Sequence, residues 1–474
     1  MNGWLMLALA RIGLLTLWRR ARWLILQVLV FLRIARPVKL VFAEHPARIG
    51  KTTLRQLVEE QCPSLCGTYT APWLLRNGLL HTVFTAKADF SKMDNLNYER
   101  QYIRLPDGGT IGMDFCPPLT EAQAMPDDVP LLLSMQVLSY LHGLSGGSHE
   151  SYVRGILAQA SRPVSQGGKG WRTVVLNFRG CANVPLTSKR LYNSGATDDL
   201  RQGLCFISHV LPQAPLLGMG FSLSANLMAV YAGEQGKDTP FKAIAVMGNI
   251  YDLYASTLKL EASLPGLMLS KAMASNVRTL VDRHRHAFED DKRIDLESLF
   301  DRPNLTLYAF DTLITAPAAG YRSAEQYYKQ CGSINYLQGI EVPYLSLNSI
   351  DDPIIDAPSI PSKPSQLSPY MTVATTDHGG HLGWHQHAVL GLIPRKTRWI
   401  TVPVLEFFSA ILSADPTPSP HRRTLPPFSG RTASTGTEVR DALRDDIGFE
   451  LIGHDTFKGG LTEADASQGL TRGL

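Results

Sequence analysis

A serine between small residues is the first candidate for chemistry in this sequence. Ser222 lies in GFSLS, with Gly220 two positions before it and Ser224 two positions after it. The apolar pair 216–217 precedes this segment, and residues 225–229 have the pattern of a helix start. A serine at a sharp strand-to-helix turn sits in strained backbone with its hydroxyl exposed for nucleophilic attack. The pentapeptide alone also fits an ordinary turn.

A serine nucleophile needs a base to take its proton and an acid to hold that base in the right tautomer. Asp352 follows the apolar run 344–348, and His381 lies in a glycine-rich loop after the run 371–375. The order is serine, acid, histidine, with separations of 130 and 29 residues. These separations leave room for an insertion before the acid and one helix after it. We therefore predict Ser222 as nucleophile, Asp352 as acid and His381 as base.

Both partners have neighbours that could replace them. Asp351 is the alternative acid, and Asp352 is preferred because it directly precedes a proline at the exit of a predicted strand. The other histidines near His381 are His378, His385 and His387. Such a run also suggests a metal site, but zinc ligands usually lie on a rigid helix or strand, and two glycines interrupt this run. We predict no metal.

The elements that must position these residues have the pattern of an α/β fold. Apolar runs alternate with helical patterns, which indicates a doubly wound, mostly parallel sheet. The predicted strands are 173–178, one that ends at the turn carrying Ser222, 241–247, 344–348 and 371–375, with a helix at 197–209 and a β-hairpin at 101–115. The apolar run 129–143 opens into a glycine-rich loop, where backbone N–H groups can face a developing negative charge. Long helical patterns at 250–335 predict a lid over the substrate pocket.

The amino terminus is hydrophobic and basic. Apolar runs at 4–17 and 23–34 flank three arginines, and the first 43 residues hold seven basic side chains and no acid. Each run is shorter than the roughly 20 residues that cross a bilayer. We expect segment 1–43 to lie in a membrane interface. A mitochondrial presequence and an uncleaved signal anchor are the alternatives.

Composition limits the remaining possibilities. The 474 residues are 44% hydrophobic and carry a formal charge of +4, so without the basic amino terminus the rest is slightly acidic and offers no general surface for nucleic acid. Six scattered cysteines indicate free thiols. Proline, serine, threonine and glycine dominate the end of the chain. The predicted divisions are a membrane-associating segment 1–43, an extension 44–94, a catalytic domain 95–413 and a largely disordered tail 414–474.

Several motifs in one order resemble a known family. They are LHGLSGGSHESY (141–152), LNFRGCANVPLTSKRLYNSGATDDL (176–200), GMGFSLSANLM (218–228), FDTLITAPAAGYRSAEQYY (310–328), LQGIEVPYLSLNSIDDP (337–353) and GGHLGW (379–384). The sequence is similar, over roughly residues 95–412, to the α/β-hydrolase-domain family of the yeast medium-chain fatty-acid ethyl ester synthase/esterases and their mammalian phospholipase and bacterial relatives. The resemblance implies the α/β-hydrolase fold. Ser224 departs from the family's glycine.

By position, the family's triad falls on Ser222, Asp352 and His381, and its oxyanion hole on the backbone N–H groups of Leu144 and Leu223. The resemblance implies serine ester hydrolysis or alcohol O-acyl transfer on medium-chain acyl esters, in lipid or secondary metabolism. Water, an alcohol and acyl-CoA would be substrates, and no cofactor is expected. The expected location is an intracellular membrane or surface: endoplasmic reticulum, lipid droplet or mitochondrial outer surface. A non-catalytic scaffold at such a surface is the alternative, and a His-x4-Asp pattern at 286–291 is interpreted as a solvated face.

Overall fold

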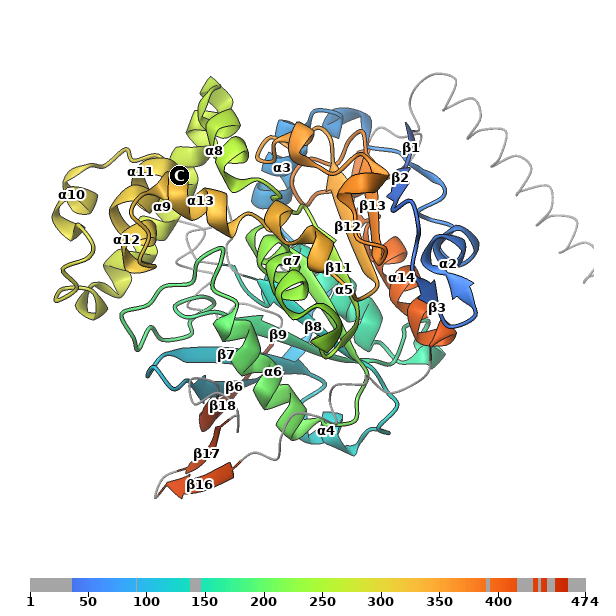
Figure 1. Cartoon of the computed structure of the whole chain (residues 1–474), viewed down its shortest axis with the longest axis horizontal. Helices are drawn as coiled ribbons and strands as arrows, with labels where there is room; N and C mark the ends of the chain where they lie inside the picture. The colour runs from blue at the N-terminus through green and yellow to red at the C-terminus, as the bar shows by residue number, and fades with distance from the viewer. Residues whose placement is uncertain are drawn as a thin grey trace, which may run out of the picture.

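The computed structural model describes residues 36–90, 92–136, 146–388, 393–415, 429–433, 436–440 and 448–458. Twelve of its strands form one sheet in the order β16-β17-β18-β6-β7-β9-β8-β10-β11-β12-β13-β2 (Figure 1). In chain order these strands are β2 (Lys39–Phe42), β6 (Asn97–Arg104), β7 (Thr110–Cys116), β8 (Leu131–Gln136), β9 (Arg172–Asn177), β10 (Leu216–Phe221), β11 (Phe241–Met247), β12 (Tyr344–Ser349), β13 (Met371–Thr376), β16 (Ser429–Ala433), β17 (Gly436–Arg440) and β18 (Gly448–Lys458).

The centre of the sheet is parallel. Strands β9, β8, β10, β11, β12 and β13 run in one direction, and every residue of β10, β11, β12 and β13 is buried. Strands covered on both faces need apolar residues throughout rather than at alternate positions, which is why they stand out in the sequence. The predicted hairpin is β6 and β7, paired antiparallel. The predicted α/β-hydrolase architecture is confirmed.

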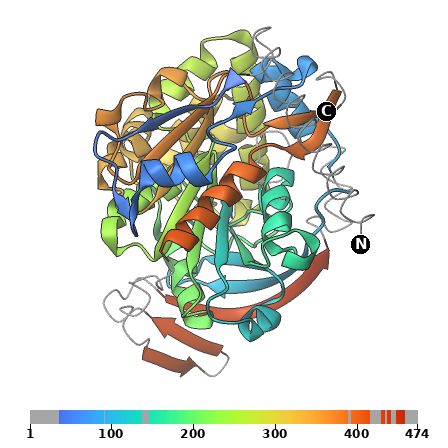
Figure 2. The ribbon, with the colours of Figure 1, turned by 90° about the vertical axis from the view of Figure 1, so that its right-hand side faces the viewer.

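Helices cover both faces of this sheet. The first face carries α6 (Asp198–Val210) and α7 (Leu223–Gln235), and the second carries α2 (Leu54–Gln61), α5 (Ser151–Ser161) and α14 (Thr401–Ala414) (Figure 2). Each set packs its apolar residues into its own hydrophobic cluster. The shorter elements outside the large sheet are β1 (Arg36–Pro37), β3 (Arg48–Ile49), β4 (Thr52–Thr53), β5 (Thr68–Tyr69), α3 (Gly78–Lys87), α4 (Leu119–Ala124), β14 (His385–Ala388) and β15 (Ile393–Arg398).

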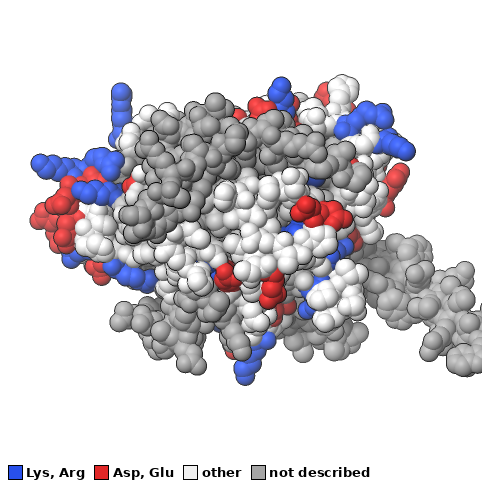
Figure 3. Space-filling model, turned by 90° about the horizontal axis from the view of Figure 1, so that it is seen from below, with Lys and Arg blue, Asp and Glu red and all other residues white. Residues whose placement is uncertain are grey.

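A helical insertion, residues 250–335, separates β11 from β12 and forms a lobe beside the sheet (Figure 1). It contains α8 (Leu253–Glu261), α9 (Leu264–Arg283), α10 (Leu296–Asp301), α11 (Leu307–Phe310), the π-helix η5 (Asp311–Thr315), α12 (Ala316–Ala318) and α13 (Ala324–Cys331). Charged side chains of both signs gather at this end of the molecule, whereas the middle of the same face is mostly uncharged (Figure 3). Part of that charge is paired, because Arg293 binds Asp291 at 2.6 Å.

The structure corrects two predicted boundaries. Strand β2 pairs antiparallel with β13, Lys39 binds Asp377 at 2.9 Å, and β1 pairs with β5, so residues 36–42 belong to the folded domain and not to a membrane-associating segment. Residues 1–35 lie outside the described part. The prediction of a largely disordered tail is wrong for β18, which pairs with β6 and buries Phe449 against Phe206. Within the described residues, no helix combines the length and apolar character needed to cross a membrane.

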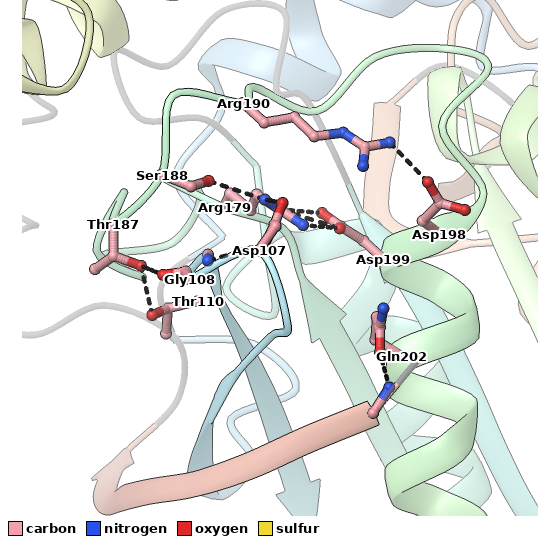
Figure 4. A network of polar contacts seen from close by, with 12 residues as sticks. Asp107, Gly108, Thr110, Arg179, Thr187, Ser188, Arg190, Asp198, Asp199 and Gln202 are labelled. Atoms are coloured by element: carbon pink, nitrogen blue, oxygen red, sulfur yellow. Dashed lines mark hydrogen bonds and ion pairs between the residues drawn. The ribbon is translucent and has the colours of Figure 1, made fainter. Parts of the chain in front are cut away.

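A buried arginine ties the loop after β9 to the hairpin turn. Arg179 binds Asp199, at the start of α6, at 2.7 Å, and also binds Asp107 in the turn between β6 and β7 (Figure 4). Its Nη1 donates to Ser188 at 2.9 Å, and Thr187 donates to the Gly108 carbonyl at 2.6 Å. These bonds anchor the loop 179–197 at its beginning, middle and end.

Replacing Asp199 with alanine should lower the free energy of unfolding by about 3 kcal/mol, because it leaves the buried Arg179 guanidinium without its main partner. Asp198→Ala is the matched control, since this neighbour occupies the same helix turn but forms a half-exposed pair with Arg190. Its cost should stay below about 1 kcal/mol. Urea unfolding measures both values, and equal losses would contradict the role given to the buried pair.

Candidate active site

Ser222 lies at the turn between β10 and α7 in a backbone conformation with positive φ, which non-glycine residues rarely adopt: φ is 55° and ψ is −119°. Strand and helix come so close here that a Cβ on Gly220 would lie 2.6 Å from the Ser224 carbonyl oxygen. Only glycine fits at that position. Ser224 itself is fully buried and its hydroxyl has no hydrogen-bond partner among the described residues, yet the turn is intact. The serine that replaces the family's glycine is therefore accommodated.

Ser222, His381 and Asp352 form a line of hydrogen bonds. The hydroxyl of Ser222 is 2.8 Å from His381 Nε2, and His381 Nδ1 is 2.7 Å from Asp352 Oδ2. All three are buried, with exposed fractions of 1%, 3% and 2% respectively. The sheet explains the meeting, because β10, β12 and β13 are parallel and each residue follows the carboxyl end of one of them. This geometry can activate a serine hydroxyl.

The two neighbouring acids, Asp351 and Asp352, have different partners. The second oxygen of Asp352 accepts the N–H groups of Ile354 at 2.8 Å and Ile355 at 3.3 Å, which fixes the carboxylate within its own turn. Asp351 instead accepts the Gly380 N–H at 2.9 Å and contacts His378 at 3.2 Å. It holds the loop that carries His381, whereas Asp352 contacts the imidazole itself.

Helix α3 of the amino-terminal extension also supports this loop, although sequence reasoning found no chemistry there. Thr82 Oγ1 accepts the backbone N–H of His381 at 2.9 Å and donates to the Gly78 carbonyl at 2.7 Å. A Cβ on Gly78 would lie 1.7 Å from the carbonyl oxygen of Asp351, so the helix rests directly on the acid turn. Thr82 and His381 are 299 positions apart, and a local sequence motif does not predict a contact over such a separation.

The other histidines of the 378–387 run point to different places. His385 is buried, packs between the rings of Phe84 and Phe90, and donates its backbone N–H to His81 Nε2 at 3.1 Å. Burial lowers the pKa of His81 to about 4, so that ring is neutral and able to accept. The side chain of His387 is not described. Among the residues whose side chains are described, no group of three or more metal-binding residues comes together.

Of the two predicted oxyanion donors, the structure describes Leu223 but not Leu144. Leu223 begins α7, where the helix offers its N–H no intrahelical carbonyl. Leu144 lies outside the described residues. The end of its glycine-rich loop is described. There the Ser148 hydroxyl donates to the fully buried Asp114 at 2.5 Å, and the Ser148 N–H donates to Asn177 Oδ1 at 3.0 Å. Arg100 holds the same carboxylate, so a buried ion pair anchors the loop.

A cavity of about 80 Å³ lies beside the elbow. Leu223 and Ile354 line it next to Ser222 and Asp352, and residues 191–194 supply one wall. The remaining wall comes from the helical insertion, including Leu253, Leu260, Met273, Val277, Leu307, Asp311, Thr315, Tyr327 and Tyr328. The site therefore combines an activated serine with an adjoining, mainly apolar pocket.

Comparison with known proteins agrees with this geometry. The family described as alpha/beta hydrolase fold matches residues 136–388, more than half of the chain. The chain belongs to the α/β-hydrolase family. Within the family, a monoacylglycerol lipase of Saccharomyces cerevisiae is 30% identical over 390 residues, covering 75% of this chain and 84% of the lipase.

Two further relatives represent other branches of the α/β-hydrolases. A phospholipase of Bos taurus is 27% identical over 367 residues, covering 77% of this chain and 83% of its own. Medium-chain fatty acid ethyl ester synthase/esterase 2 of Saccharomyces cerevisiae is 28% identical over 398 residues, covering 72% and 84%. The resemblance read from the sequence motifs is confirmed.

Thr82→Val should slow the labelling of Ser222 by a fluorophosphonate about tenfold, because the buried N–H of His381 loses its acceptor and the imidazole loses its fixed position. Thr85→Val is the matched control: Thr85 lies on the same helix and makes the same type of bond, to the His81 carbonyl at 2.9 Å, but does not contact His381. Its labelling rate should stay near that of the wild type. Equal slowing in both variants would mean that α3 acts only through stability.

Proposed function

We propose that this protein is a serine carboxylic ester hydrolase that also transfers acyl groups to alcohols. The observation that carries the proposal is the line of hydrogen bonds from Ser222 through His381 to Asp352, at 2.8 and 2.7 Å. The adjoining apolar pocket supports an acyl chain as the bound group. The relatives' names, a lipase, a phospholipase and an ester synthase/esterase, support ester substrates and water as the second reactant.

In the proposed reaction, Ser222 Oγ attacks the ester carbonyl while His381 Nε2 takes its proton. Asp352 accepts the Nδ1–H, keeps the imidazole in the right tautomer and stabilises the imidazolium. The N–H groups of Leu223 and Leu144 hold the oxyanion. His381 then returns the proton to the departing alcohol, leaving the acyl group on Ser222. Water or a second alcohol, deprotonated by His381, releases it as an acid or a new ester.

We further propose medium-chain acyl groups as substrates, with acyl-CoA as an alternative acyl donor and no cofactor. The balance between hydrolysis and transfer depends on how well the insertion, acting as a lid, excludes water while an alcohol enters. The hydrophobic, arginine-rich amino terminus would hold the enzyme at an intracellular membrane or lipid-droplet surface, where such substrates dissolve. A role in lipid or secondary metabolism fits these substrates.

The central test is Ser222→Ala. The wild type should react with a fluorophosphonate probe and hydrolyse p-nitrophenyl octanoate, and added ethanol should divert product to ethyl octanoate. Ser222→Ala should lose labelling and at least about 10³-fold in turnover, since the nucleophile is gone. Ser224→Ala, a serine two positions away, should keep both. A folded wild type that neither labels nor turns over would favour the scaffold alternative.

Membrane attachment has its own test. Exchanging Arg19, Arg20 and Arg22 for glutamine in the full chain should weaken binding to vesicles containing phosphatidylserine by at least about tenfold, since each basic residue near an anionic surface contributes about 1 kcal/mol. Vesicle flotation measures the bound fraction, and neutral phosphatidylcholine vesicles are the control. Unchanged binding to anionic vesicles would mean that these arginines do not face the lipid.

A further inference from the structure

One residue that lines the mainly apolar pocket is acidic. Asp311 lines the cavity from the helical insertion, and only 8% of it is exposed. It opens the π-helix η5, and Thr315 at the other end of that helix lines the same cavity. A π-helix is a rare form that occurs often at functional sites. The insertion thus departs from α-helical geometry at the point where it presents polar groups to the pocket.

The Asp311 carboxylate accepts fewer hydrogen bonds than an ionised carboxylate can. Thr315 donates to Oδ1 at 2.5 Å and Tyr328 to Oδ2 at 2.5 Å. Both donors are neutral hydroxyls, whereas an ionised carboxylate can accept about four hydrogen bonds. The charge that acts on it from α8 is Glu261, which is also acidic. Burial raises the pKa of Asp311 to about 6, so it is largely ionised at neutral pH with no cation described beside it.

A purely structural role accounts poorly for this arrangement. The bond from Tyr328 ties η5 to α13 and the bond from Thr315 lies within η5, and an amide or hydroxyl at position 311 could accept such bonds without a charge. Burying an ionised carboxylate without a counter-charge costs several kcal/mol, and extra donors reduce that cost. Asp311 lines the same cavity as Leu223, the residue after Ser222. A substrate bound there can supply the missing donor.

Further hydrogen-bonding groups line the pocket besides Asp311. The hydroxyl of Tyr327 is 2.7 Å from the Ser194 hydroxyl and accepts the Ser194 N–H at 2.8 Å, and both residues line the cavity. The wall from α8 and α9 is mainly apolar, with Leu253, Leu260, Met273 and Val277. Its two hydroxyls already have partners: Thr257 donates to the Leu253 carbonyl at 2.8 Å, and Ser256 accepts the Asp356 N–H at 3.0 Å. The cavity therefore has a hydrocarbon side and a hydrogen-bonding side.

We propose that Asp311 selects esters that carry a hydroxyl group, which donates a hydrogen bond to its carboxylate while the hydrocarbon part packs against α8 and α9. This inference rests on the proposed ester chemistry at Ser222 and specifies its substrate class. The hydroxyl can belong to the acyl chain or to the alcohol part of the ester. Asp311 would be a specificity-determining residue, not part of the bond-breaking machinery.

The experiment compares kcat/KM within two matched pairs of substrates. The acyl arm uses p-nitrophenyl 8-hydroxyoctanoate against p-nitrophenyl octanoate, and the alcohol arm uses 1-octanoylglycerol against propyl octanoate. The wild type should prefer the hydroxyl-bearing member in at least one arm, and the arm identifies the source of the hydroxyl. In Asp311→Asn that preference should fall about tenfold, the loss of one charge-assisted hydrogen bond.

Two controls separate this result from damage to the fold. Asp301→Asn removes an exposed acid from the same insertion and should keep the wild-type preference. Tyr328→Phe removes a donor to Asp311 but keeps the carboxylate, so the preference should persist. Fluorophosphonate labelling of each variant reports whether Ser222 is still active. No preference in either arm for a labelled wild type, or an unchanged preference in labelled Asp311→Asn, would overturn the inference, whereas an unlabelled wild type would overturn the proposed function itself.

The preference should also depend on pH. Because the pKa of Asp311 is raised to about 6, the carboxyl is mostly protonated at pH 5 and ionised at pH 8, and the ionised form is the stronger acceptor. The preference should therefore rise between these values in the wild type and stay flat in Asp311→Asn. An effect of pH on the acyl-transfer step itself is common to both members of a pair and cancels in the ratio.

The other titratable groups facing Asp311 are Glu261 on α8 and Tyr327 and Tyr328 on α13. The pKa values of both tyrosines are raised well above 10, so they do not titrate in this range. Glu261→Gln should shift the rise to lower pH without abolishing it, because it removes a nearby negative charge. A flat wild-type ratio would contradict the assignment of the preference to Asp311.

Discussion

The rest of the site depends on one strained residue. Ser222 is held at positive φ, a conformation that costs a non-glycine residue of order 1–3 kcal/mol. The strain persists because β10 and α7 on either side are almost wholly buried and cannot move apart to relieve it. Their close contact leaves no room for a side chain at Gly220. The packing of the central sheet therefore determines where the Ser222 hydroxyl points. The loops that carry His381 and Asp352 must place these residues in line with it.

The partners come from loops, which need separate support. Asp352 is fixed by N–H groups of its own turn, and Lys259 from α8 donates to the carbonyls of Asp352 at 3.2 Å and Ile355 at 2.5 Å. The histidine loop is held by Asp351 on one side and Thr82 on the other. The helical insertion and the amino-terminal extension thus both brace the site from outside the sheet. The contributions of Lys259 and Thr82 are positional, since both bind backbone groups of the loops that carry Asp352 and His381.

The sequence predicts the central fold well and its periphery poorly, for a physical reason. Strands buried on both faces appear as continuous apolar runs, so 241–247 was predicted with the bounds that β11 has and the others differ by one or two residues. The order of Ser222, Asp352 and His381 follows from the same strands. In contrast, β18 contains charged and glycine residues, and of its residues 448–454 only Gly448 and Phe449 are buried, so its pairing with β6 depends on tertiary contacts rather than on pattern.

The same distinction explains why Asp311 was missed. In the sequence it belongs to the motif 310–328, but nothing in that motif distinguishes it as a pocket residue, and an exposed acid, Asp301, lies only ten residues earlier. It becomes unusual only when η5 turns it towards the cavity and α13 places Tyr328 on its carboxylate. An α/β-hydrolase sheet fixes the chemistry at one edge, and the insertion is free to vary what is bound above that edge. Specificity is therefore encoded in contacts between insertion helices, where a sequence pattern carries least information.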